Sequence, residues 1–229
     1  MTLPAFDRYF RRGDSLLAGA LRVLEASTGE KYSSSSTRRA LDLAAGVPAA
    51  LFGLPVVFGM AVANKGAHPL LPAFFVQERA GQGSPLKIVK LRTMLPRDPD
   101  SSAPQHVHEV DRVTLFGRVM RRYYLDEVPQ LLLVLNGKLS LVGIRVLPVP
   151  VYEHLRSTWS AARFERWSGC YATSRLGLTG LHQVYRRSGK EDSQRFHRDV
   201  FYARRASLGF DLYLLWKTLE RIIDRIWAA

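Results

Sequence analysis

Two adjacent carboxylates, Asp126 and Glu127, stand between a pair of arginines and a proline in the stretch RRYYLDEVPQLL. Pro129 fits only the first turn of a helix, so we expect Asp126 near the helix N-cap. Backbone amides at that end of a helix stabilise a carboxylate as the anion, which suits a nucleophile or a metal ligand. The same pattern is also ordinary helix-start chemistry, and taken alone it favours a structural role.

Cations elsewhere in the chain could bind a phosphate substrate beside the acidic doublet, Asp126 and Glu127. Lys90 and Arg92 lie two residues apart in a predicted strand, so both side chains point to one face, about 6–7 Å apart. Two cations on one face suit a diphosphate. Arg121 precedes the doublet and would attract phosphate, and Arg145 follows a glycine in SLVGIRV. Each cation taken singly is read more simply as a solvated surface charge.

Several other chemistries are excluded. The chain lacks the P-loop pattern G-x-x-x-x-G-K-[ST], the dinucleotide pattern G-x-G-x-x-G and the zinc-protease pattern H-E-x-x-H. Its six histidines show no metal-ligand spacing. A single cysteine, Cys170, rules out an internal disulfide framework and any multi-cysteine zinc site, and fits a reducing, cytosol-facing location.

The composition is that of a folded protein with an anionic partner. The 229 residues suffice for one ordinary domain with a core, and a content of 47% hydrophobic residues excludes a disordered chain. The formal net charge of +13 predicts nucleic acid, acidic lipid or a phosphate-rich substrate as partner.

One segment is far more apolar than the rest. From Leu43 to Ala63 no residue is charged, and these 21 residues would form a helix of roughly 30 Å, enough to cross a hydrocarbon core. Both flanks are net positive, and positive flanks stay in the cytoplasm. Pro48 and Pro55 interrupt the segment, so we expect a break at Pro55 that returns the chain to the same side. A kinked helix that crosses the membrane once is an equally weighted alternative.

The remaining elements place these residues. Residues 4–26 have the pattern of an amphipathic helix, and 27–36 read as a polar linker. A Gly-rich turn between 74–79 and 86–94 predicts a β-hairpin, and 95–110 a loop. Helices are expected at 115–125, at 128–135 with a stop at Asn136-Gly137, and as one or two helices over 191–227.

Taken together, these segments resemble the bacterial sugar transferase family, the small monotopic polyprenyl-phosphate phosphoglycosyl transferases. The resemblance covers about residues 37–220. The matching stretches, in order, are Arg38-Arg39-Ala40-Leu41-Asp42 with the apolar run, Phe74-Phe75-Val76-Gln77-Glu78-Arg79 with Gly81, Lys90-Leu91-Arg92-Thr93-Met94, Asp111-Arg112-Val113-Thr114, Gly117-Arg118, Leu125-Asp126-Glu127-Val128-Pro129-Gln130-Leu131, Ser140-Leu141-Val142-Gly143, Gly177-Leu178-Thr179-Gly180, Gln183-Val184, Asp199, Tyr202, Ser207-Leu208, Asp211 and Lys217-Thr218.

The resemblance implies an α+β fold with a re-entrant, helix-break-helix membrane segment (37–64) and a mixed α/β catalytic domain with a β-hairpin and amphipathic interfacial helices (65–229). The N-terminal amphipathic helix and linker (1–36) lie outside the match and form the third expected part. It implies that the catalytic domain lies on the cytoplasmic face of the bacterial membrane.

It also implies a reaction. Asp126 would attack the sugar-bearing phosphate of a UDP-sugar and release UMP, and polyprenyl phosphate would then take the phosphosugar from the carboxylate. In that reaction Mg²⁺ would be held by Glu127 and Asp126. The substrates would be bound by Lys90, Arg92, Arg121, Gln130 and Arg145. The sugar stays open, as does the choice between a monomer and a homo-oligomer.

The chain departs from the family pattern beside Arg145, where Ile144 and Val146 replace prolines, and at Leu176, which replaces a proline before Gly177. Because proline fixes φ, we expect looser placement of Arg145. Two alternatives therefore remain, a different lipid or alcohol acceptor, and a catalytically degenerate membrane scaffold. Nucleic-acid binding is the weakest interpretation because it leaves the broken apolar segment unexplained.

Overall fold

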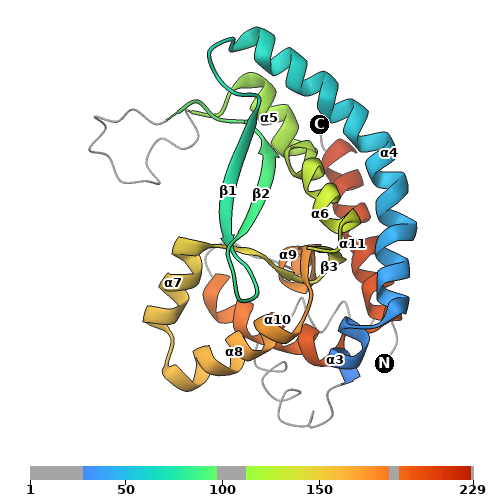
Figure 1. Cartoon of the computed structure of the whole chain (residues 1–229), viewed down its shortest axis with the longest axis vertical. Helices are drawn as coiled ribbons and strands as arrows, with labels where there is room; N and C mark the ends of the chain where they lie inside the picture. Colours follow the sequence, from blue (N-terminus) through green and yellow to red (C-terminus); the bar gives the residue numbers. More distant parts are fainter. Residues whose placement is uncertain (1–27, 97–111, 186–190, 228–229) are drawn as a thin grey trace.

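The computed structural model describes residues 28–96, 112–185 and 191–227, and Figure 1 shows their arrangement. The expected helix over 4–26 and most of the expected loop over 95–110 lie outside these residues. The first half of the described chain contains α3 (Thr28–Ser33), α4 (Ser36–Ala67), β1 (Phe74–Ala80), β2 (Leu86–Leu91), α5 (Leu115–Arg122), the 3₁₀ helix η1 (Leu125–Gln130) and α6 (Leu131–Leu135). The second half contains β3 (Ser140–Val142), β4 (Ile144–Arg145), β5 (Leu147–Pro148), α7 (Val149–Thr158), α8 (Ala161–Thr173), β6 (Leu176–Thr179), α9 (Leu181–Tyr185), α10 (Glu191–Arg205) and α11 (Leu208–Trp227).

The fold is a mostly helical mixture of helices and short strands, which confirms the mixed α and β content of the expected α+β fold. The re-entrant geometry and the amphipathic interfacial helices stay predictions. The hairpin is confirmed, since β1 and β2 pair antiparallel from Phe74 opposite Leu91 to Arg79 opposite Leu86. Strand β5 extends this sheet on the other side of β1. The expected helices at 115–125 and before Asn136-Gly137 are present, and 191–227 forms two helices. Gly137 has a positive φ of 79°, which suits the end of α6.

The stretch 27–36 is not the linker that we expected, because it contains α3. That helix packs on α10: a Cβ added at Gly29 would lie 2.0 Å from the carbonyl oxygen of Ala203. Ser33 at the end of α3 is buried. The polar composition of this stretch gave no sign of the contact between α3 and α10, which requires a glycine at position 29.

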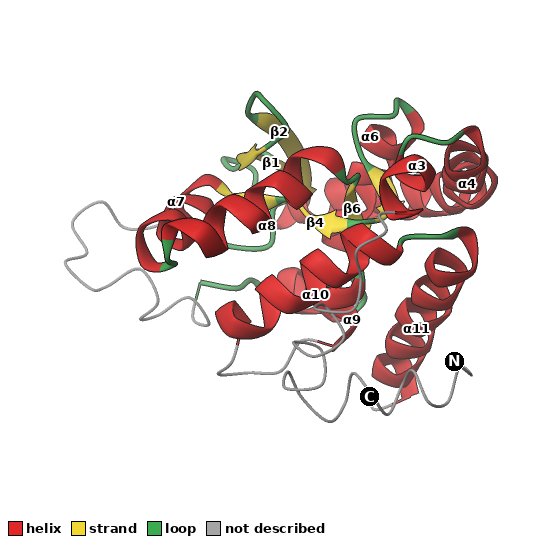
Figure 2. Ribbon diagram, turned by 90° about the horizontal axis from the view of Figure 1, so that it is seen from below, coloured by secondary structure: helices red, strands yellow, loops and turns green. Residues whose placement is uncertain are grey.

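A second sheet is parallel, with β6 between β3 and β4. Its strands approach unusually closely, because a Cβ added at Gly177 would lie 2.2 Å from the backbone nitrogen of Gly143. Figure 2 shows β4 and β6 near the centre of the molecule, with helices around them. The main hydrophobic core lies here and includes Ile144, Trp167 and Val200, all of which are 1% exposed or less.

Helix α4 runs along one side of the molecule in Figure 1, and its axis curves. It continues through Pro48 and Pro55 over 32 residues, so the expected break at Pro55 is not seen as an interruption of the helix. It is long and apolar enough to cross a membrane, and it is the one such helix in the described part of the chain. Phe52 and Phe58 are 74% and 70% exposed, whereas Ala50, Val57 and Ala61 are buried against the rest of the protein.

Both ends of α4 are fastened to the main body. Near its start, Arg38 is 2% exposed and donates to the Ser140 hydroxyl (3.1 Å) and to the Tyr202 hydroxyl (3.1 Å), and lies 3.4 Å from a carboxylate oxygen of Asp211. Near its end, the Asn64 amide donates to the backbone oxygen of Arg92 at 3.0 Å. The packed face of α4 thus runs along the body from its first turn to its last.

Candidate active site

The acidic doublet lies in the first turn of η1, directly after a strained residue. Tyr124 is the N-cap of η1, with φ 57° and ψ 19°, a left-handed conformation that is rare for a bulky side chain and costs about 1–3 kcal/mol. The guanidinium of Arg225 covers its ring at 4.5 Å from the centroid. We expected Asp126 near the N-cap, and it lies two residues after it, in the first turn of η1. The chain turns at Tyr124 and begins its helix at Leu125, so Asp126 does not cap.

Glu127 is the centre of an ion-pair cluster. Its Oε1 atom accepts from Lys90 Nζ at 2.7 Å and from Arg145 Nη2 at 2.5 Å. Burial would raise the pKa of Glu127, but the charges and hydrogen bonds of Arg145 and Lys90 outweigh it and lower the pKa to about 2. Glu127 is therefore an anion at every physiological pH.

Asp126 has a different environment from its neighbour. Burial raises the pKa of its carboxyl, and the negative charge of Glu127 adds to that rise, against the opposing charges of Lys90 and Arg121. We expected the helix terminus to favour the anion, and the net direction is the opposite. Two adjacent carboxylates thus have pKa values moved in opposite directions, which is typical of sites where the two have separate roles.

Asp126 lines a basic cavity of about 480 Å³. Five cations line the same cavity, namely Arg79, Lys90, Arg92, Arg112 and Arg121. Three of them donate to neutral oxygens: Arg92 Nε to the Pro72 carbonyl, Arg112 to the Leu95 carbonyl and Arg121 Nε to the Thr93 hydroxyl, at 2.8, 2.9 and 2.9 Å. Their charges are not cancelled by those bonds, so the cavity suits a multiply charged anion.

The structure brings together four of the five cations and amides predicted from the sequence. Lys90, Arg92 and Arg121 line the basic cavity, and Arg145 contacts Glu127 of the doublet. Gln130 is 4% exposed and lines neither the basic cavity nor the second cavity described below. Its role in substrate binding stays a prediction.

Sequence reasoning missed Arg79 and Arg112. Arg79 is 7% exposed, and burial together with the nearby charge of Arg145 lowers its pKa to about 10. Phe75, Gln77 and Arg79 all line the basic cavity, as expected for alternate residues of one strand. That alternation in FFVQER could have placed Arg79 on the same strand face as Phe75, which pairs with Lys90.

Arg145 makes defined contacts although both flanking prolines are absent, and its looser placement stays a prediction. Ile144 and Val146 are 1% and 4% exposed, so the strand directs both apolar side chains into the core and leaves Arg145 on the other face. Arg145 pairs with Gly177 of β6 in the parallel sheet, and its Nη1 donates to the Leu178 carbonyl at 3.4 Å. Burial of the flanking residues therefore replaces the restraint that proline would supply.

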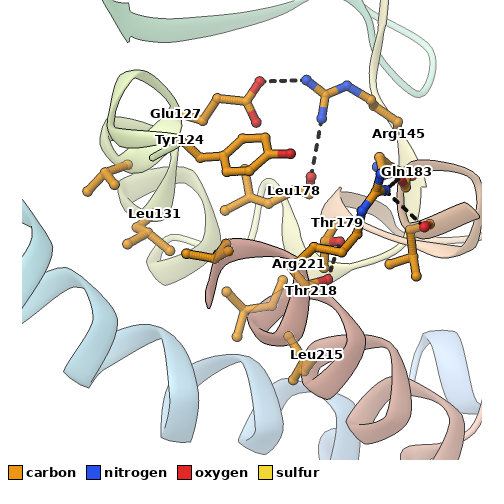
Figure 3. A pocket seen from close by; sticks show the side chains of 14 residues that line it. Tyr124, Glu127, Leu131, Arg145, Leu178, Thr179, Gln183, Leu215, Thr218 and Arg221 are labelled. Atoms are coloured by element: carbon orange, nitrogen blue, oxygen red, sulfur yellow. Dashed lines mark hydrogen bonds and ion pairs between the residues drawn. The ribbon is translucent and has the colours of Figure 1, made fainter. Parts of the chain in front are cut away.

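A second cavity, of about 280 Å³, has Glu127 of the doublet in its wall (Figure 3). Glu127, Arg145 and Arg221 line it together with Tyr124, Gln183 and two threonines, and the rest of the wall is apolar. The apolar lining residues are Val128, Leu131, Leu141, Leu178, Val184, Leu215 and Ile222. Asp126 thus borders a basic cavity, and Glu127 borders a largely apolar one.

The two carboxylates could together hold a magnesium ion. No cluster of three or more His, Cys, Asp and Glu ligands occurs in the described ranges, so a cation there would have at most two protein carboxylates. That number fits Mg²⁺, which keeps several waters and binds substrate phosphates alongside one or two carboxylates. Both cations of the cluster contact the Oε1 atom of Glu127, and Oε2 remains as the oxygen for such a role.

Comparison with known proteins gives a consistent picture. A family model described as bacterial sugar transferase matches residues 33–225. The chain is 37% identical over 193 residues to a UDP-glucose:undecaprenyl-phosphate glucose-1-phosphate transferase of Caulobacter vibrioides, an alignment that covers 81% of this chain and 69% of the relative. It is 31% identical to the UDP-galactose-lipid carrier transferase of Erwinia amylovora over 216 residues, covering 85% of this chain and 42% of that protein. It is also 31% identical over 188 residues to an Escherichia coli protein with the same name as the Caulobacter one, covering 80% and 39%.

Proposed function

The chain belongs to the bacterial sugar transferase family, and from this premise we propose that it transfers a sugar phosphate from a UDP-sugar to undecaprenyl phosphate or a related polyprenyl phosphate and releases UMP. The product is a polyprenyl-diphosphate sugar, the lipid-linked starting unit of a glycoconjugate or exopolysaccharide. The names of the relatives support a phosphate-bearing lipid as the acceptor.

The observation that carries this proposal is the position of the Asp126 carboxylate in a cavity lined by five cations. A diphosphate would be attracted there by the cations, and its phosphorus would meet a carboxylate that burial makes less acidic than usual. A cavity that only stored an anion would gain nothing from a carboxylate in its wall, because the like charges repel.

The reaction proceeds in two displacements. A carboxylate oxygen of Asp126 forms a bond to the phosphorus that bears the sugar, and the bond from that phosphorus to the bridging oxygen of UMP breaks, so UMP leaves with the electron pair. An oxygen of polyprenyl phosphate then bonds to the same phosphorus, and the bond to Asp126 breaks, which restores the carboxylate. The covalent intermediate divides a transfer between a soluble donor and a lipid acceptor into two steps.

The other residues of the site bind and orient. Lys90, Arg92 and Arg121 offset the charge on the donor phosphates, where positioning and electrostatics supply most of the rate enhancement. Glu127 holds Lys90 and Arg145 in place as a permanent anion. We further propose that Glu127 and Asp126 hold Mg²⁺, which would neutralise phosphate charge when bound.

The same site lies at a membrane surface in this proposal. Because α4 is packed on the catalytic body from Arg38 to Asn64, a helix that crossed the bilayer completely would carry charged parts of the body with it. We propose instead that α4 enters the cytoplasmic leaflet by its exposed apolar face, bends near Pro55 and stays on the cytoplasmic side. The apolar residues exposed on α11, among them Trp216 and Trp227, would rest in the same interface.

The test is the donor half-reaction alone. Detergent-solubilised protein is incubated with UDP-sugars and Mg²⁺ without lipid, and UMP release and the mass of the peptide containing Asp126 are measured. We expect about one UMP per enzyme and a phosphosugar adduct on Asp126. Asp126→Asn should form no adduct and lose at least a thousandfold in overall rate, as is typical when an essential nucleophile is removed.

A matched control is Asp224→Asn, which removes a carboxylate from an exposed position on α11. It should retain both the burst of UMP and the adduct. If wild-type protein makes the lipid product while no adduct forms, or if Asp126→Asn remains active, then the covalent mechanism is wrong.

A further inference from the structure

The two cavities that meet at the doublet differ in chemistry, and only the basic one is explained by a nucleotide donor. The second cavity has charged groups at one end and an apolar wall at the other. In Figure 3 Glu127 and Arg145 lie at its upper side, Leu131 at the left and Leu215 at the bottom. Such a division suits a ligand with an anionic head and a hydrocarbon tail.

We propose that this cavity, which we call the lipid cavity, receives the first isoprene units of the polyprenyl phosphate acceptor, with the phosphate turned toward Arg145. This inference rests on the proposed function and adds to it a separate place for the acceptor. The donor occupies the basic cavity, which Asp126 lines, and the acceptor chain lies in the cavity that Glu127 lines. After UMP has left, the acceptor phosphate passes Glu127 and attacks the phosphorus on the face that UMP vacated, in line with the bond to Asp126.

Charge complementarity supports the orientation of the acceptor. Two guanidinium groups, Arg145 and Arg221, line the lipid cavity against one carboxylate, Glu127, with which Arg145 is paired, so the charges of the lining leave a net positive excess. Arg221 Nη1 is held by the backbone oxygens of Gln183 and Val184, at 2.5 and 2.9 Å, which fixes its position without neutralising its charge. The side-chain amide of Gln183 lines the same cavity, and both its polar atoms are buried without a hydrogen-bond partner among the described residues. A phosphate oxygen in the cavity would give that amide a partner.

The position of α11 supports a path from the membrane. One face of this helix, which carries Leu215 and Ile222, lines the lipid cavity. Leu219 and Ile226 each follow one of these residues by four positions and are 48% and 47% exposed. Residues four apart are neighbours on a helix surface, so the exposed apolar stripe continues directly into the cavity wall. A lipid chain that lies along the stripe would reach the doublet without crossing polar surface.

The size of the cavity defines what it can hold. About 280 Å³ is at the lower end of small-molecule sites, which are roughly 300–1,000 Å³. It can therefore enclose only the part of a polyprenyl chain next to the phosphate, while the rest remains in the bilayer. We accordingly expect the enzyme to distinguish acceptors by their phosphate-proximal isoprene units and to be indifferent to total chain length.

The test separates the two half-reactions in the Leu215→Gln variant, which puts a polar amide into the cavity wall. In detergent with undecaprenyl phosphate, we expect the KM for the lipid to rise about tenfold, in line with a lost apolar contact in a pocket, while the lipid-free burst of UMP is kept. The control is Leu70→Gln, the same change at a position that is 96% exposed, outside α11 and outside both cavity linings. It should leave the lipid KM within about twofold of wild type.

A second measurement does not depend on the folding of a variant. A polyprenyl phosphate with a photoreactive group on its first isoprene unit is crosslinked to wild-type protein, and labelled peptides are mapped. We expect labels on η1 and α11, competed by undecaprenyl phosphate. Labels confined to the β1–β2 hairpin, an unchanged lipid KM in Leu215→Gln, or equal loss of both half-reactions in that variant would overturn the inference. Failure of wild-type protein to release UMP or to form the lipid product would instead count against the proposed function.

Discussion

Replacement of Arg145 by methionine tests how strongly the ion-pair cluster holds the doublet. The pKa of Glu127 is about 2 against an ordinary value of 4.5, so the cluster favours the anion by about 3 kcal/mol at 1.36 kcal/mol per pH unit. Arg145 is the stronger of the two favourable partners. Arg145→Met should therefore lower the free energy of unfolding by about 2 kcal/mol at pH 7, within the range of about 1.5–3 kcal/mol for hydrogen bonds to charged groups.

The loss should depend on pH in a defined direction. The folded-state pKa of Glu127 is depressed, so its stabilisation is fully present above pH 4.5 and disappears as the pH falls through about 2. The gap between wild type and Arg145→Met should therefore narrow as the pH is lowered. Denaturant unfolding in a non-ionic detergent, from pH 7 to pH 3, measures this gap directly.

Arg156→Met is a matched control. Arg156 pairs with Glu153 at 3.7 Å on the surface of α7, where the side chains are 66% and 54% exposed. Such pairs contribute about 0–1 kcal/mol. The reasoning is refuted if Arg145→Met costs no more than this control, or if its cost is the same at pH 7 and pH 3. A double-mutant cycle with Glu127→Gln should return most of the 2 kcal/mol as coupling between the two residues.

Two further predictions concern the anchor of α4 and the acid limb of catalysis. Arg38→Met should lower the free energy of unfolding, measured by thermal unfolding, by about 3–5 kcal/mol, because it leaves the buried Asp211 without its ion-pair partner. A loss of less than about 1 kcal/mol would contradict the role of Arg38 in anchoring α4. Lys90→Met should move the acid limb of the pH profile for UMP release to higher pH. The charge of Lys90 lowers the pKa of Asp126, so its removal lets burial raise that pKa further. An acid limb that stays in place or moves to lower pH would show that Asp126 is not the group that titrates in it.

Local patterns in the sequence predicted the elements that depend on local chemistry. The Gly-rich turn gave the β1–β2 hairpin, and Asn136-Gly137 marked the end of α6. The strand spacing of Lys90 and Arg92 placed both at one cavity. These features follow from backbone geometry within a few residues, and a single sequence is enough to find them.

What the sequence could not predict depends on contacts between distant segments. Arg112 is far from Lys90 in the sequence, and only the tertiary fold places it at the basic cavity. The left-handed conformation at Tyr124 could not be predicted, because the residue is neither glycine nor asparagine. The N-cap was consequently expected near Asp126, two residues after its position at Tyr124. The position of Arg145 likewise depends on the burial of Ile144 and Val146 in the core. The loss of two prolines in the sequence gives no sign of that burial.

The fastening of α4 at both ends has a consequence for how the protein would respond to its bilayer. A single-pass helix joined to its catalytic domain by a flexible linker can change its tilt when the hydrocarbon thickness changes. The distance between that catalytic domain and the bilayer is then variable. Here Arg38 and Asn64 hydrogen-bond the two ends of the apolar helix α4 to the same domain that contains Asp126. In the proposed membrane arrangement, the height of Asp126 relative to the lipid phosphates would then be set by the protein alone and should be the same in thin and thick membranes.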